Sequence, residues 1–165
     1  MPDTEMEETK AFLAELEQRR GGKITYRAFS AFYGDNRGIL REFGVFFYEV
    51  DKTFWFQDFE RENTFLGFKI GAKKAEKYVM FESSFSPLDV VGIRKVLKSR
   101  ARKCVQDAKP FDKLKTYNPV LFALSEYVTE ITLKDGRIMF FQFIDSTVEK
   151  KIKQYQMDNQ DTKGD

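Results

Sequence analysis

Residues 127–155, YVTEITLKDGRIMFFQFIDSTVEKKIKQY, decide the fold prediction, and their first part predicts a β-hairpin. The segments 127–133 and 138–144 are rich in β-branched and aromatic residues, which favour strands. Asp135-Gly136 lies between them and is typical of tight hairpin turns, because it accepts positive φ angles. Two antiparallel strands joined by a short turn therefore follow from local sequence alone.

The second part of this stretch predicts an amphipathic helix. Ser146 is followed three residues later by Glu149, which is a capping-box pattern for a helix N-terminus. Val148, Ile152 and Tyr155 then fall on one helical face. The chain is expected to close with a hairpin and a helix that packs on it.

Five more strands are predicted upstream of this hairpin. Runs rich in aromatic and aliphatic residues are separated by Gly, Asp and Asn turns, at residues 23–33, 39–50, 53–60, 64–70 and 78–85. Connections this short are typical of antiparallel hairpins that follow one another as a meander.

Two helices are predicted outside the strands. An N-terminal helix spans 8–20 and ends at Gly21-Gly22. Ser86-Pro87 predicts the start of a second helix over 86–103, since a hydroxyl cap precedes proline at the first helical position. Its expected buried stripe is Val90, Ile93, Leu97, Ala101 and Cys104.

The remaining segments set the domain boundaries. Residues 1–8 and 158–165 are polar and are expected to be disordered, whereas 119–125 is apolar and fits either a strand or a helical turn. We therefore expect an N-terminal tail and helix at 1–22, one β-rich domain at 23–157, and a C-terminal tail at 158–165.

Seven antiparallel strands followed by one helix resemble the pleckstrin-homology-like superfold, which includes GRAM-like and bacterial PH-like domains. The resemblance covers residues 23–157 and rests on the order of elements. It implies an α+β, mainly β fold: a partly open seven-stranded barrel capped by the C-terminal helix. The predicted helix 86–103 is an insertion after the fifth strand and departs from that layout. The sequence departs from most PH domains because it has no Trp in the last helix.

Composition indicates one domain with an aromatic core. The chain has 165 residues, of which 42% are apolar, and it contains 18 Phe. Phe adds large buried area without a polar group, so a ring-filled β core is one interpretation. The other is a small barrel around an apolar ligand, lined by Phe46, Phe54, Phe56, Phe140 and Phe143.

Charge and residue usage exclude several function classes. The net charge of +2 argues against a dedicated nucleic-acid binder. There is no His and a single Cys, Cys104, so the commonest general base and Cys-based metal sites are missing. We find no catalytic motif, and we expect no enzyme activity, cofactor or metal. An acidic N-terminus without an apolar core is no signal peptide, and the expected location is cytoplasmic.

Basic residues form two candidate binding sites. The predicted helix 86–103 carries six cations against the single acid Asp89, a net charge of +5: Arg94, Lys95, Lys98, Arg100, Arg102 and Lys103. Such a face binds anionic lipid or a partner, or is simply solvated. The first hairpin offers a second anion site at Lys23, Arg27, Arg37 and Arg41. It lacks the final basic-x-Arg step by which PH domains hold inositol phosphates.

Three functions follow as hypotheses. The first is a non-catalytic PH-like module that binds a protein partner or itself, through a strand edge or the basic helix. The second is peripheral attachment to anionic membrane, at its inner face, through the basic helix. The third is the apolar ligand-binding barrel.

Overall fold

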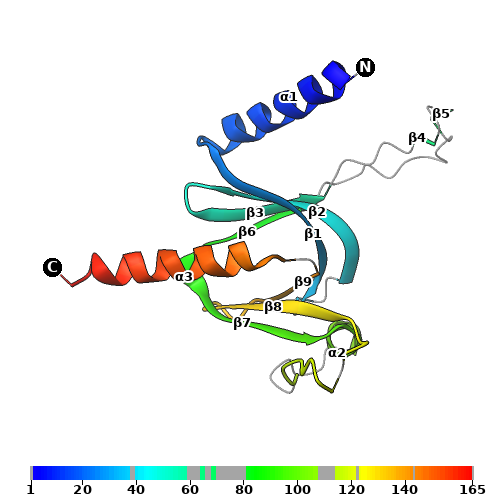
Figure 1. Cartoon of the computed structure of the whole chain (residues 1–165), viewed down its shortest axis with the longest axis vertical. Helices are drawn as coiled ribbons and strands as arrows, with labels where there is room; N and C mark the ends of the chain where they lie inside the picture. The colour runs from blue at the N-terminus through cyan, green and yellow to red at the C-terminus, as the bar shows by residue number, and fades with distance from the viewer. Residues whose placement is uncertain are drawn as a thin grey trace.

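The computed structural model describes residues 2–37, 40–58, 64–65, 68–69, 81–107, 114–121, 123–142 and 144–164. Within them the fold is α+β and mainly β (Figure 1). The elements are, in order, α1 (Pro2–Arg20), β1 (Ile24–Asp35), β2 (Leu40–Val50), β3 (Thr53–Asp58), β4 (Thr64–Phe65), β5 (Phe68–Lys69), β6 (Glu82–Phe85), η1 (Pro87–Asp89), β7 (Val90–Leu97), α2 (Lys98–Asp107), β8 (Tyr127–Leu133), β9 (Ile138–Gln142) and α3 (Ser146–Asp161).

Seven of the strands form one antiparallel sheet in the order β6-β3-β2-β1-β9-β8-β7. Strands that follow one another along the chain are neighbours in this sheet, with one exception: β6 and β7 do not pair and form its two edges. In addition, β1 pairs with β9. The first and last strands of the meander therefore lie side by side, and the sheet curls around an interior (Figure 1).

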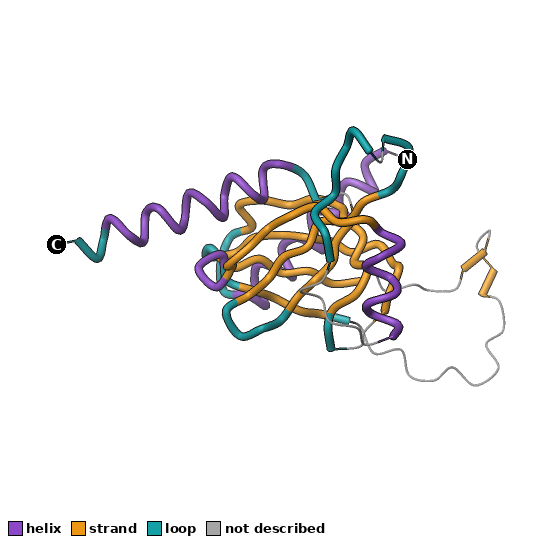
Figure 2. Tube along the Cα trace, turned by 90° about the horizontal axis from the view of Figure 1, so that it is seen from below, coloured by secondary structure: helices purple, strands orange, loops and turns teal. Residues whose placement is uncertain are grey.

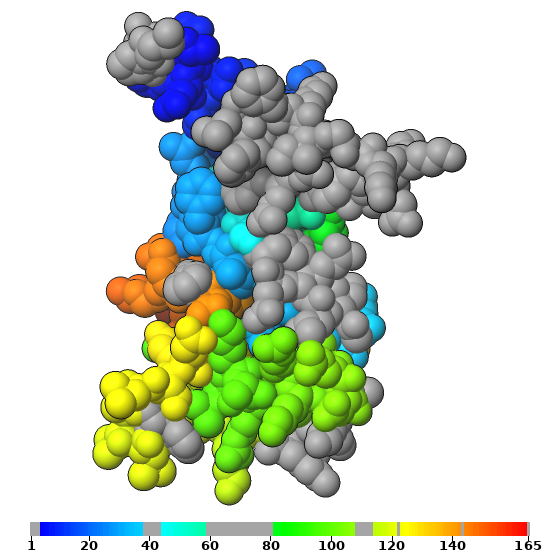
Figure 3. Space-filling view, turned by 90° about the vertical axis from the view of Figure 1, so that its right-hand side faces the viewer, coloured from blue at the N-terminus to red at the C-terminus, as the bar shows by residue number. Residues whose placement is uncertain are grey.

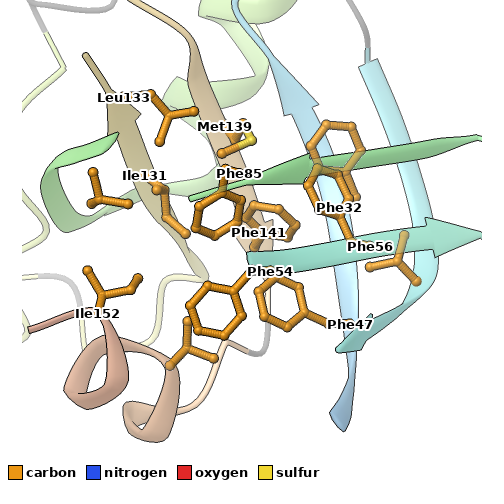
Figure 4. Packing of buried hydrophobic residues seen from close by; sticks show 13 residues of the cluster. Phe32, Phe47, Phe54, Phe56, Phe85, Ile131, Leu133, Met139, Phe141 and Ile152 are labelled. Carbon is orange, nitrogen blue, oxygen red and sulfur yellow. The ribbon is translucent and has the colours of Figure 1, made fainter. Parts of the chain in front are cut away.

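The interior of the curled sheet is filled by aromatic rings (Figure 4). Phe47 and Phe56 from the middle strands meet Phe141 of β9, with ring centroids 5.8 and 4.9 Å apart. Val148 and Ile152 of α3 belong to the same buried cluster, so α3 packs against it. This packing confirms the Phe-rich β core.

The outer face of the sheet carries two smaller cores, one under each of the other helices. Leu16 of α1 is fully buried against Phe46, Tyr48 and Val50 of β2. Around α2, a separate cluster joins the helix to β1, β7, β8 and β9: Tyr33, Val96, Ala101, Cys104, Val105, Leu114, Val128 and Phe140. The two helices lie at opposite ends of the molecule (Figure 1).

Side chains rather than strand pairing close the seam between β6 and β7. Arg137, in the β8–β9 turn, donates from Nη1 to Ser83 Oγ at 2.9 Å and from Nη2 to the Ser84 carbonyl at 2.5 Å. From α3, Gln156 Nε2 donates to the carbonyls of Pro87 and Val90 at 3.0 and 2.7 Å. The bonds to Ser84 and Val90 satisfy carbonyls of the two edge strands, whereas the Pro87 carbonyl, in η1, also accepts from the Val90 amide.

The closing hairpin and helix lie where the sequence places them. Gly136 has φ +87° and the Gly136 amide donates to the Leu133 carbonyl at 3.0 Å, so the turn uses glycine for its left-handed residue. The helix starts one residue earlier than the capping box implies, since Asp145 is the cap and its Oδ1 accepts from the Thr147 amide at 2.8 Å. Val148 and Ile152 are buried, whereas Tyr155 is half-buried.

The predicted helix 86–103 is wrong. Ser86 does cap a turn, by accepting from the Leu88 amide at 3.2 Å, but this turn ends after the three residues of η1. The next eight residues form β7, because their β-branched side chains pair with β8 in an antiparallel register from Val90 to Leu97. The inserted helix is α2 at Lys98–Asp107, and it does follow the fifth strand of the large sheet.

Other element boundaries are also corrected. The sequence predicts 64–70 as one of the seven strands, but within it β4 and β5 form a separate two-stranded sheet. Strand β7, predicted as helix, completes the seven strands of the large sheet. Helix α1 begins at Pro2 instead of residue 8, and acidic side chains in a first turn suit the helix dipole. Helix α3 extends to Asp161, beyond the expected start of a C-terminal tail, and projects past the strands (Figure 2).

Candidate functional site

Helix α2 is held so that one stripe is buried and the other exposed. Ala101, Cys104 and Val105 pack on the outer face of the sheet, which confirms Cys104 as a buried thiol. Arg102 and Lys103 are exposed beside them. The helix therefore presents its cations to solvent because its short apolar stripe is fully used in packing.

A shallow hollow of about 540 Å³ runs along the exposed side of α2. Its walls include Lys98, Arg102, Lys103 and Gln106 of the helix, together with Glu126. Lys98 Nζ lies 3.1 Å from Glu126 Oε2, so one acid partly neutralises the site. The ammonium also lies 5.6 Å from the centroid of the Tyr33 ring, within cation–π range.

The six cations expected on one helix are divided between β7 and α2. Arg94 is a structural residue, because its Nε and Nη2 donate to the two carboxylate oxygens of buried Glu130 at 2.8 and 3.1 Å. Lys95 is exposed on β7, with its ammonium 4.7 Å from the centroid of the Tyr127 ring. The helix itself carries the remaining four: Lys98, Arg100, Arg102 and Lys103.

Two of the cations predicted at the first hairpin, Lys23 and Arg37, lie at opposite ends of β1. The 12 residues of β1 separate them along the chain, roughly 40 Å of strand at about 3.3 Å per residue. Lys23 pairs with Glu17 at 2.8 Å, and Arg37 lies 3.8 Å from Asp135. Arg27 is exposed on β1, and the side chain of Arg41 lies outside the described part of β2.

Sequence reasoning missed the exposed apolar turn next to α2. Val120, Leu121 and Leu124 are 87%, 73% and 103% exposed, in the segment that the sequence left between a strand and a helical turn. The available signal was an apolar run between Pro119 and Ser125 without the alternation of a strand. Figure 3 shows this segment (yellow) beside β7 and α2 (green), at the end of the molecule opposite α1.

A buried carboxylate lies where α3 packs against the sheet. Glu49 is 1% exposed, and Lys151 Nζ lies 2.8 Å from its Oε2 while the Tyr155 hydroxyl donates to its Oε1. The hydrogen bond with Glu49 raises the pKa of Lys151, and burial together with this carboxylate raises the pKa of Tyr155. Glu49 therefore fastens α3 to the sheet through two groups one helical turn apart.

Alkaline pH is expected to weaken this attachment. Because folding raises both pKa values, the folded state holds these protons more tightly than the unfolded chain, and the stability gained is lost as pH rises above the ordinary tyrosine value of 10.0. Urea unfolding from about pH 8 to about pH 11 should reveal the decline. Glu49→Gln removes the charge, so its stability should fall less steeply; an equal decline in both proteins would contradict this role.

Two kinds of feature are absent from the described residues. None of the helices among them has the length and apolar run needed to cross a bilayer. Within the same residues, no three side chains of the His, Cys, Asp and Glu types gather in a way that could hold a metal ion.

Comparisons of the chain with known proteins add no information on its fold or function. No protein-family profile matches the chain, no curated protein matches it, and no solved structure matches it.

Proposed function

We propose that this chain is a non-catalytic PH-like module that attaches to an anionic membrane surface through the α2 end. We define the α2 end as the described residues 95–107, 114–121 and 123–127. The antiparallel meander, in which β1 pairs with β9 and α3 packs against the interior cluster, supports the PH-like assignment.

Charge separation along the molecule is the observation that carries the proposal. The α2 end has six cations, Lys95, Lys98, Arg100, Arg102, Lys103 and Lys115, against Asp107 and Glu126, a net charge of +4. Helix α1, at the opposite end, has six acids against three cations. An anionic surface would attract one end and repel the other, and so orient the protein.

The form of the cationic surface favours lipid over a compact ligand. Arg102 and Lys103 are exposed, and the hollow beside them is open to solvent. Such cations can reach many phosphates at once, which is how a basic helix contacts a bilayer. We do not propose the apolar ligand-binding barrel, because Phe54 and Phe56 belong to the packed interior whereas Phe46 and Phe140 belong to outer clusters; Phe143 lies outside the described residues.

The non-catalytic part of the proposal rests on how the buried carboxylates are used. Glu49 is paired with Lys151 and Glu130 with Arg94, so both acids stabilise contacts between elements. A carboxylate whose oxygens are already held in an ion pair is poorly placed to act as a general base, because taking up a proton would break that pair.

Co-sedimentation with vesicles tests the proposal. We expect the protein to bind phosphatidylserine-containing vesicles, to ignore neutral phosphatidylcholine vesicles, and to lose affinity steeply as salt rises, because screening weakens exposed charges. Absence of binding to anionic vesicles at low salt would overturn the membrane function. In that case we would assign the same surface to the binding of an acidic protein partner or of a second copy of this chain.

A further inference from the structure

The described part of the chain concentrates its exposed apolar side chains in one place. Four of its nine large exposed apolar residues lie within eight positions: Val120, Leu121, Leu124 and Tyr127. Leu124 is fully exposed. Single exposed apolar residues need no explanation, but a cluster beside a charged surface marks a contact.

The exposed turn is built into the fold at both ends. Before it, Thr116 pairs with Val96 of β7, and the Tyr117 amide donates to the Lys95 carbonyl at 2.6 Å. After it, the Lys98 amide donates to the Glu126 carbonyl at 3.1 Å. The turn is therefore anchored to the start of α2 and to its preceding strand.

Local chemistry also shapes the turn. Asn118 Oδ1 accepts from the Val120 amide at 3.0 Å and from the Leu121 amide at 3.4 Å, and Pro119 fixes its own φ. The rings of Tyr117 and Tyr127 pack at 5.2 Å where the two arms of the turn meet. A turn held in this way exposes its leucines at little further entropic cost on binding.

The surroundings select the kind of surface that can cover these side chains. Lys98, Arg102 and Lys103 line the same hollow as Ser125 and Glu126, which follow the exposed leucines. Lys95 lies over the Tyr127 ring, and Lys115 precedes the turn. A bilayer with anionic headgroups places phosphates at the level of such cations and acyl chains just beneath them. Tyr is itself favoured at this boundary, which suits the partly exposed Tyr127.

We propose that Val120, Leu121 and Leu124 insert into the acyl-chain boundary of an anionic bilayer while the cations of α2 contact the phosphates. This inference rests on the proposed membrane function and adds a second, apolar component to it. Electrostatic attraction brings the α2 end to the surface, and insertion then gives a part of the binding that salt does not screen.

A fluorescent reporter in the turn tests insertion directly. The chain has one Trp, Trp55, so Leu124→Trp in a Trp55→Phe background reports only on the turn. We expect its emission to shift to the blue with phosphatidylserine vesicles, and to be quenched by spin-labelled acyl chains. Vesicle binding without either change would overturn the insertion and leave the membrane function intact, whereas no vesicle binding would overturn both.

A serine double variant provides the second test. Leu121→Ser with Leu124→Ser removes exposed groups and is expected to keep the fold, while its affinity for anionic vesicles at high salt falls at least about tenfold. Leu88→Ser with Val91→Ser is the matched control, since both residues are exposed outside the turn. Wild-type binding by the turn variant at high salt, or a change in its oligomeric state in place of a change in binding, would overturn the inference.

Discussion

Replacing Phe47 with alanine is expected to lower the free energy of unfolding by about 3–5 kcal/mol, the largest stability effect that we predict for one substitution. Phe47 is fully buried, and its ring lies 5.3 Å from Phe54, 5.8 Å from Phe141 and 6.2 Å from Phe85. These partners come from three other strands, so the cavity would lie where the curled sheet meets itself.

Phe29→Ala is the matched control for this prediction. Phe29 lies on β1 and is 72% exposed, so its loss should cost less than about 1 kcal/mol. Urea unfolding followed by far-ultraviolet circular dichroism measures both variants on the same scale. Equal losses of stability would contradict a core centred inside the curled sheet.

Reversing three charges on α2 is expected to abolish membrane binding at physiological salt. In Arg100→Glu, Arg102→Glu, Lys103→Glu the exposed cations of the helix become acids. Each cation near an anionic surface contributes about 1 kcal/mol, so losing three contributions alone weakens binding roughly 150-fold. Repulsion by the new acids adds to this loss.

The matched control changes net charge by the same amount elsewhere. This control is the triple variant Lys10→Glu, Lys153→Glu, Lys163→Glu. The three cations are exposed and lie outside the α2 end: in α1, in α3 and just after α3. We expect this control to bind anionic vesicles within a few-fold of wild type, because exposed charges more than a Debye length from the surface are screened. If both triple variants lost similar affinity for anionic vesicles, then binding would depend on the net charge of the protein and not on the α2 end.

Local chemistry explains the parts of the fold that the sequence predicts. The hairpin around Gly136 and the buried positions Val148 and Ile152 depend on turn geometry and helical spacing within a few residues. Short connections account for three of the six strand pairs in the large sheet, namely β1–β2, β2–β3 and β8–β9. Asp51 and Lys52 illustrate the limit of such rules, since they adopt φ of 48° and 58° in a hairpin turn without glycine.

Non-local pairing explains the largest error. Residues 90–97 contain apolar positions that fit a helix after a genuine Ser86-Pro87 cap, but β8 offers them an antiparallel partner more than thirty residues away. Seven ladder positions outweigh a weak helical preference, especially with Gly92 and several β-branched residues in the segment. Arg94 therefore pairs with Glu130 in the sheet and leaves the candidate surface.

The candidate site was only partly predictable for a related reason. The cations of α2 are visible as a basic run, and Arg102 and Lys103 are exposed as expected. The leucines at 121 and 124 are apolar, and apolar residues are ordinarily assigned to a core. Only the fold reveals that the clusters beneath α2 and inside the sheet are complete without them.

Hydrogen–deuterium exchange with and without phosphatidylserine vesicles tests the central claim most directly. If the α2 end is the membrane contact, amides in 98–107 and 114–127 should exchange more slowly on vesicles, whereas amides in the exposed first half of α1 should be unchanged. Protection on α1, or vesicle binding with no protection at the α2 end, would contradict the account.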